Sequence, residues 1–185
     1  MVALWLVAAG CASIRPLPPA RRGVPVPPDA GDAQYFAANP LMVPVAGVPP
    51  GHVPDSFNQP RDGGRLHRAT DILAPMGTPV VAAEAGTILR LSQNHLGGNT
   101  IYMVDDDGRF VYYYAHLERY SVHAATGAHV WQGTVIGYVG MTGNAPVPHL
   151  HFQAMRRDPA RQDYWNGAPV DVRPYFTLEG KEVRP

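Results

Sequence analysis

Short apolar runs dominate the pattern of hydrophobic and polar positions along the chain. They are rich in β-branched and aromatic residues, and Gly, Pro or Asn bounds them. The runs are residues 78–83, 86–91, 100–104, 110–114, 130–131, 134–139 and 149–155. This pattern is typical of several short strands joined by tight connections. It therefore predicts an all-β domain with a mainly antiparallel sheet.

Two local features refine this prediction. The sequence Asp105-Asp106-Asp107-Gly108 separates two of the runs and is typical of a hairpin turn, because Asp-Gly tolerates positive φ. A calcium loop is the alternative, but the remaining ligands do not follow at the required spacing. Nearer the N-terminus, residues 32–39 allow one short helix.

Composition narrows the class of protein. With 185 residues, 45% hydrophobic and 16% charged, the chain can bury a core. Its 19 Gly and 20 Pro argue against a helix bundle, and its zero formal net charge argues against binding nucleic acid through bulk positive charge. A single cysteine excludes an intrachain disulfide and a cysteine-based zinc cluster. Any metal site must therefore use histidines and carboxylates.

The N-terminus begins with an apolar run. Residues 2–9 are too short to cross a bilayer, which takes about 20 residues, but long enough for the apolar region of a signal peptide. Small residues then precede Cys11, and this resembles the lipobox of bacterial lipoproteins. The resemblance implies lipidation at Cys11 and, because Ala12 follows, a periplasm-facing protein anchored in the outer membrane. The alternative is a buried N-terminal strand with a free thiol.

A proline-rich stretch follows. Residues 13–28 contain six prolines in sixteen positions, which favours an extended spacer over a packed element. We therefore expect residues 1–10 to be a lipoprotein signal peptide and residues 11–42 a lipidated N-terminus with a tether. Residues 43–185 are expected to form the β domain.

Four histidines and one aspartate suggest chemistry. His67 and Asp71 lie in an HxxxD sequence, and the glycines before it and Pro75 after it favour a loop entering a strand. His149 and His151 flank a leucine, so on a strand both imidazoles point to the same side. His116 ends an aromatic run.

Each of these motifs is weak alone, since a lone histidine is more often an ordinary surface or core residue. Their combination is more specific. A nitrogen–oxygen zinc site with catalytic activity needs three protein ligands and one open position for water. Two histidines and a carboxylate supply such a set, and two histidines remain for proton transfer and charge stabilisation.

The order of these motifs resembles the lysostaphin/LytM-type zinc endopeptidases, which cut peptidoglycan peptides. HxxxD is followed by Tyr-x-His-Leu and then by Thr-Gly and His-x-His-Phe. The turn at residues 71–80 and the glycines at 86, 97, 98, 137, 140 and 143 agree with the family. The likeness covers roughly residues 43–178. Ala69, where many members have Gly, and the turn at residues 144–148 depart from it, and both bear on substrate preference.

The resemblance implies a role for each residue. It makes His67, Asp71 and His151 the ligands of one zinc ion per chain, and His116 and His149 the catalytic pair. One histidine of the pair would take the proton of the attacking water and the other would stabilise charge or orient that water. The sequence leaves open which residue does which.

Other polar and aromatic residues carry less information. Candidates for lining a substrate groove are Tyr112, Tyr113, Tyr114, Asn58 and Arg61, although tyrosines on a strand are more often packing residues. Four histidines outside the motifs are expected on the surface: His52, His95, His123 and His129.

Three function classes follow. The first is a cell-wall metalloendopeptidase that cuts peptidoglycan cross-links, with D-alanyl–diaminopimelate bridges favoured over glycine bridges. The second is a catalytically silent member of the same fold that binds peptidoglycan or activates an amidase. The third is a β-domain binding module for carbohydrate or a carrier protein, with an incidental metal. A monomer is expected.

Overall fold

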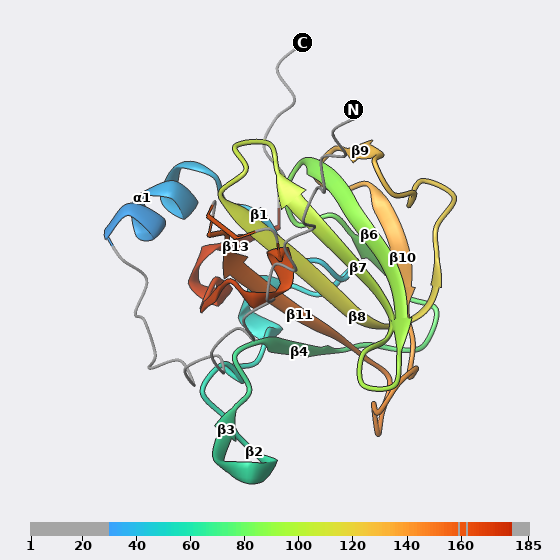
Figure 1. Ribbon diagram of the computed structural model, residues 1–185. Coiled ribbons are helices and arrows are strands. Elements are labelled where there is room, and N and C mark those ends of the chain that lie inside the picture. Colours follow the sequence, from blue (N-terminus) through green and yellow to red (C-terminus); the bar gives the residue numbers. More distant parts are fainter. Residues whose placement is uncertain (1–29, 159, 162, 179–185) are drawn as a thin grey trace, which may run out of the picture.

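A computed structural model describes residues 30–158, 160–161 and 163–178 (Figure 1). The predicted signal peptide, the lipidation site Cys11 and the spacer at residues 13–28 lie outside the described residues. Within the described residues, no helix has the length and apolar character needed to cross a membrane.

The centre of the fold is a sheet of nine strands among the described residues. Its strands are β4 (Thr70–Leu73), β5 (Pro79–Val81), β6 (Gly86–Asn94), β7 (Gly98–Asp105), β8 (Phe110–Tyr120), β9 (His129–Val130), β10 (Val135–Val139), β11 (His149–Arg156) and β12 (Ala168–Val170). The order β12-β11-β8-β7-β6-β9 forms its main path, and β4 pairs with β11. All of these pairings are antiparallel, which confirms the predicted fold class.

Each of the seven predicted runs overlaps a strand. The largest difference is β8, which continues beyond Tyr114 to Tyr120. Its added half pairs with β10, where Val139 lies opposite Leu117 and Gly137 opposite Tyr120. The predicted run ends at Tyr114 because polar residues interrupt the apolar pattern beyond it, where only one face of the strand is buried. The turn after β7 is as predicted, with Gly108 at φ 69°.

Strand alternation separates a buried face of the sheet from an open one. Tyr112 and Tyr114 of β8, and Phe152 of β11, are almost fully buried in the core. Tyr113 and His151 alternate with them and lie on the opposite, partly exposed face. The suggestion that Tyr112 and Tyr114 line a groove is therefore wrong, because both side chains belong to the core.

A helix and two short strands cover one edge of this core (Figure 1). They are α1 (Ala30–Ala38), β1 (Leu41–Met42) and β13 (Phe176–Thr177). Phe36 of α1 packs on Phe110 with ring centroids 4.5 Å apart, and β1 pairs in parallel with β13. The helix expected at residues 32–39 is thus present, and it packs against the β domain that the sequence pattern predicts from residue 43.

The remaining elements are small. A hairpin of β2 (Pro60–Arg61) and β3 (Arg65–Leu66) projects beside β4 (Figure 1). Short 3-10 turns are η1 (Pro50–His52), η2 (Asp62–Gly64), η3 (Tyr164–Asn166) and η4 (Arg173–Tyr175). The hairpin and η3 matter for function, because each brings residues to the open face of the sheet.

Candidate metal centre

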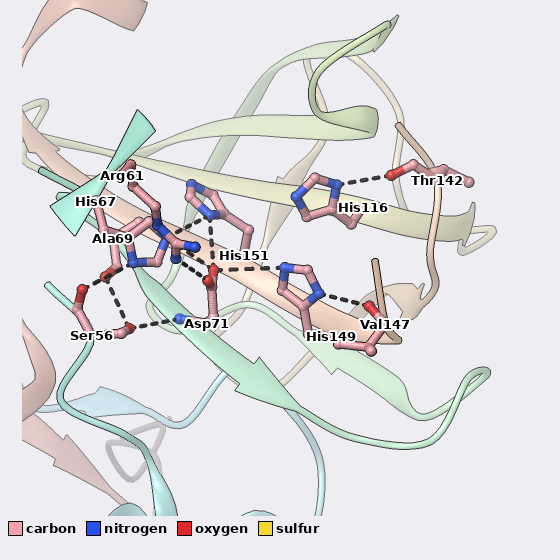
Figure 2. Close-up of polar contacts among 10 residues, drawn as sticks. All are labelled: Ser56, Arg61, His67, Ala69, Asp71, His116, Thr142, Val147, His149 and His151. Carbon is pink, nitrogen blue, oxygen red and sulfur yellow. Dashed lines mark hydrogen bonds and ion pairs between the residues drawn. The ribbon is translucent and has the colours of Figure 1, made fainter. Parts of the chain in front are cut away.

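Neighbouring strands bring the predicted ligands together on the open face. Asp71 of β4 lies directly opposite His151 of β11 in the antiparallel register, so their side chains point the same way. His67 comes from the segment between β3 and β4 and reaches the same point (Figure 2). The strand assignments therefore explain why residues 80 positions apart in sequence meet.

The three donor atoms form a nearly equilateral triangle. His67 Nε2 lies 3.1 Å from His151 Nδ1 and 3.0 Å from Asp71 Oδ1, and His151 Nδ1 lies 3.0 Å from that same oxygen. Tetrahedral zinc with bonds of about 2.0–2.2 Å keeps its ligand atoms about 3.3–3.5 Å apart. Small outward shifts of the side chains would reach that spacing, so the group fits a zinc ion.

Ser56 supports two of these ligands. Its carbonyl oxygen accepts a hydrogen bond from His67 Nδ1 at 3.0 Å, which fixes the tautomer that leaves the Nε2 lone pair for a metal. Its hydroxyl accepts from the backbone N–H of Asp71 at 3.1 Å and lies 3.3 Å from the carbonyl oxygen of Ala69. Sequence reasoning missed Ser56, since a serine in a loop belongs to no metal motif.

Arg61 holds the other side of the Asp71 carboxylate. Its guanidinium lies 2.5 Å from Asp71 Oδ2 and leaves Oδ1 facing the two histidines (Figure 2). Burial acts to raise the pKa of Asp71, but the hydrogen bonds and charges of His151 and His67 outweigh it and lower the pKa well below its usual range. Asp71 is therefore a carboxylate ready to bind a cation. Arg61, expected as a groove residue, thus orients the Asp71 carboxylate.

His149 lies next to the triangle. Its Nδ1 donates to the carbonyl oxygen of Val147 at 2.8 Å, so in the neutral ring Nε2 carries the lone pair. That Nε2 lies 3.7 Å from Asp71 Oδ1, and the side chain is only 8% exposed. The ring thus lies beside the donor triangle with Nε2 as its acceptor atom.

His116 reaches the open face through a bulge in β8. Tyr114 and Leu117 both face the core although three positions separate them, so the alternation is broken between them. His116 adopts φ 62°, a strained value for a non-glycine residue, and its N–H donates to the carbonyl of Gly97 at 2.7 Å. The bulge turns the imidazole toward His149, with ring centroids 4.7 Å apart.

A second backbone carbonyl fixes the His116 ring. Nδ1 of His116 donates to the carbonyl of Thr142 at 2.8 Å, which leaves Nε2 as an acceptor in the neutral form (Figure 2). Burial lowers the pKa of His116 to about 4, so the ring is neutral near pH 7. The loop carrying Thr142 packs tightly on Gly98, at φ 64°, where an added Cβ would overlap the Thr142 side chain.

Two groove candidates remain, Tyr113 and Asn58. Tyr113 is partly exposed on the same face, with its ring centroid 6.0 Å from that of His151. Asn58 is exposed and accepts a hydrogen bond from Arg68 at 2.9 Å. As expected, four histidines outside the motifs are exposed: His52, His95, His123 and His129.

Replacement of Ser56 by alanine should lower zinc affinity about 10–100-fold, the usual cost of losing a hydrogen-bond partner of a metal ligand. The variant removes the hydroxyl that holds the Asp71 backbone and leaves the ligands themselves intact. Ser121→Ala is the matched control, because its hydroxyl also accepts a backbone N–H and donates to a carbonyl, but away from the ligands. Competition with a chromogenic chelator measures both affinities, and equal values would remove Ser56 from the site.

Three ligands and two further histidines on the open face of an antiparallel sheet are the features of a hydrolytic metal centre. The comparisons with known proteins agree. The chain belongs to peptidase family M23, whose model matches residues 65–172.

Individual relatives support this assignment. The chain is 40% identical over 118 residues to lysostaphin from Staphylococcus simulans, covering 63% of this chain and 22% of that protein. It is 40% identical over 89 residues to peptidoglycan DD-endopeptidase ShyC from Vibrio cholerae, covering 48% and 20%. A zinc-containing peptidase structure from Vibrio cholerae superposes with a TM-score of 0.53 at 26% identity, covering 63% and 33%. The chain therefore spans less than a quarter of the length of these two sequence relatives.

Proposed function

We propose that this protein is a zinc metalloendopeptidase that hydrolyses peptide cross-links of peptidoglycan. The observation that carries the proposal is a complete triangle of donor atoms from His67, Asp71 and His151, with the imidazoles of His149 and His116 beside it. Zinc, when bound, lowers the pKa of a water molecule and polarises the scissile carbonyl. Membership of family M23 and the names of the matched relatives support both the metal and the substrate class.

The two histidines take different roles in this proposal. His149 Nε2, which lies 3.7 Å from Asp71 Oδ1, accepts the proton that the attacking water loses. His116 also presents Nε2 as an acceptor, because Nδ1 donates to Thr142, and this favours orienting the water over donating to the oxyanion in the resting state. Once protonated during turnover, either ring becomes a donor toward the leaving amine or the oxyanion.

A catalytically silent binding role is the second candidate. Such a protein needs the fold but not a complete set of ligands and proton-transfer groups. Here all five side chains are present and each lies beside at least one other of the set, and backbone carbonyls fix the Nδ1 atoms of His67, His116 and His149. This arrangement supports catalytic activity over a catalytically silent binding role.

Digestion of purified sacculi tests the proposal. We expect soluble products whose masses identify a cleaved cross-link, with D-alanyl–diaminopimelate bridges favoured over glycine bridges. The name of the Vibrio cholerae relative, a DD-endopeptidase, supports that preference. Zinc-loaded protein that releases no product from sacculi of either bridge type would leave the silent role as the better description.

The proposal places the protein in the cell envelope as a lipoprotein facing the periplasm, with the outer membrane favoured. It rests on the apolar run before Cys11 and on the small residues that separate them. Replacing Cys11 by alanine should move the protein from the membrane fraction to soluble or unprocessed forms. The measurement is fractionation with intact-mass analysis; unchanged membrane partitioning without an acyl mass would contradict lipidation.

A further inference from the structure

A line of aromatic side chains crosses the open face of the sheet, starting at the metal ligands. Tyr113 of β8 and Tyr102 of β7 lie directly opposite each other, with ring centroids 4.6 Å apart. Tyr164 of η3 stands against Tyr102 at 5.5 Å, and Trp165 follows at 4.9 Å. We call Tyr113, Tyr102, Tyr164 and Trp165 the aromatic row.

The row is continuous with the candidate metal centre. The Tyr113 ring contacts the imidazole of His151 edge-on, with centroids 6.0 Å apart. Gln153, two residues after His151 on the same side of β11, lies opposite Tyr113. A substrate bound at the metal would therefore extend over the row without crossing an edge of the sheet.

The row stays accessible although it is aromatic. Tyr102, Tyr113 and Tyr164 are partly exposed, and Trp165 is 46% exposed. Neighbours on the same strands, such as Tyr112 and Met103, point to the other face and are fully buried. Solvent-accessible aromatic rings grouped beside a catalytic site are more typical of ligand contact than of core packing.

Polar groups frame the row at both ends. Arg90 of β6 lies opposite Tyr102 and is exposed, while Gln153 lies at the β11 end. From Gln153 on β11 to Arg90 on β6, the row and the polar residues that frame it span three interstrand spacings, about 14 Å in all, which is long enough for a disaccharide. Flat aromatic rings pack against the C–H faces of sugars, and hydroxyl, amide and guanidinium groups surround these rings. This combination suits a neutral sugar better than a charged or purely apolar ligand.

We propose that the aromatic row is a subsite for the N-acetylated amino sugars of the glycan strand, next to the peptide that is cut. This inference rests on the proposed peptidoglycan activity and adds a recognition element to it. The pyranose faces pack on Tyr102 and Tyr113, and Tyr164 and Trp165 close the far end. Arg90 and Gln153 hydrogen-bond the hydroxyl and acetamido groups.

Two substrates with the same cross-linked peptide test the subsite, one still attached to its disaccharides and one freed of sugar by an amidase. The readout is the ratio of kcat/KM for the sugar-bearing substrate to that for the free peptide. Losing one stacking ring should lower this ratio about two- to twelvefold in Tyr102→Ala and in Trp165→Ala. Tyr102→Phe keeps the ring and should retain most of the ratio.

Trp131→Ala is the matched control, since Trp131 is an exposed tryptophan outside the row. Its ratio should equal that of the wild type. If the ratios of Tyr102→Ala and Trp165→Ala also equal the wild-type ratio, the subsite is overturned even though the peptidase activity stands.

A binding experiment separates failure of the subsite from failure of the proposed activity. Tetra-N-acetylchitotetraose is titrated into the full zinc-loaded chain and followed by NMR. Saturable shifts that weaken in Tyr102→Ala support the subsite whether or not the protein hydrolyses sacculi. If the wild type hydrolyses neither peptide substrate and the tetrasaccharide also does not bind, both proposals fail.

Discussion

Alanine in place of His67, Asp71 or His151 should remove most of the zinc and reduce sacculus digestion to background. Each side chain supplies one corner of the donor triangle, and two remaining corners do not make a stable site. The loss of zinc affinity should exceed the about 10–100-fold that follows loss of a supporting hydrogen bond. Elemental analysis of the purified variants gives the zinc content directly.

The structure offers a matched control for these variants. His129 forms an exposed ion pair with Asp106 at 2.9 Å, the same pair of residue types without a third ligand. His129→Ala should therefore retain one zinc per chain and full activity. Full zinc in all three ligand variants would show that the metal binds elsewhere.

Zinc removal should also lower thermal stability. Asp71 and His151 are far apart in sequence, so a bound ion stabilises the pairing of β4 with β11 by mass action. A ligand at about 100 times its Kd contributes about 2.7 kcal/mol, or about 5–10 °C in a domain of this size. A chelator should lower the melting temperature of the wild type by this amount and leave that of Asp71→Ala unchanged.

Much of this site follows from local patterns in the sequence. The alternation of His149, Leu150 and His151 on a strand fixes which rings share a face, and β11 has this geometry. The apolar runs likewise predict most of the sheet, because buried strands need continuous apolar or alternating residues. These features depend only on nearby residues, so a single sequence reveals them.

Other features depend on contacts that no local pattern encodes. The orientation of His116 requires a bulge whose reason is the register between β7 and β8, where the pairing shifts between Asn99 and Ile101. Ser56 acts through its backbone carbonyl as well as its hydroxyl, and a carbonyl has no sequence signature. Arg61 reaches Asp71 only because a short hairpin folds over the site.

The packing of the N-terminal segment is a further example. Residues 30–42 contain only four apolar or aromatic side chains larger than alanine, yet two of them, Phe36 and Leu41, are completely buried. Their partners, Phe110 and Phe176, are distant in sequence. The helix was predictable, but its attachment to the sheet was not, because a short apolar stripe does not show which surface it will cover.

Replacement of His149 or His116 by alanine should separate catalysis from metal binding. Neither ring supplies a corner of the ligand triangle, so both variants should keep their zinc and fold. Loss of a positioned base costs about 10²–10⁴-fold in rate, and loss of a group that orients water or stabilises charge costs about 10²–10³-fold. We expect the larger loss for His149, whose Nε2 lies 3.7 Å from Asp71 Oδ1 and is the proposed acceptor of the water proton.

These losses should appear in kcat more than in KM, because the two rings act on groups that change charge in the transition state. Zinc content and sacculus digestion are measured on the same protein batches, with His95→Ala as an exposed-histidine control. Wild-type digestion by His149→Ala or His116→Ala would exclude that residue from catalysis. Loss of zinc from either variant would instead make that histidine a ligand, and the division of the five residues into three ligands and a catalytic pair would have to be redrawn.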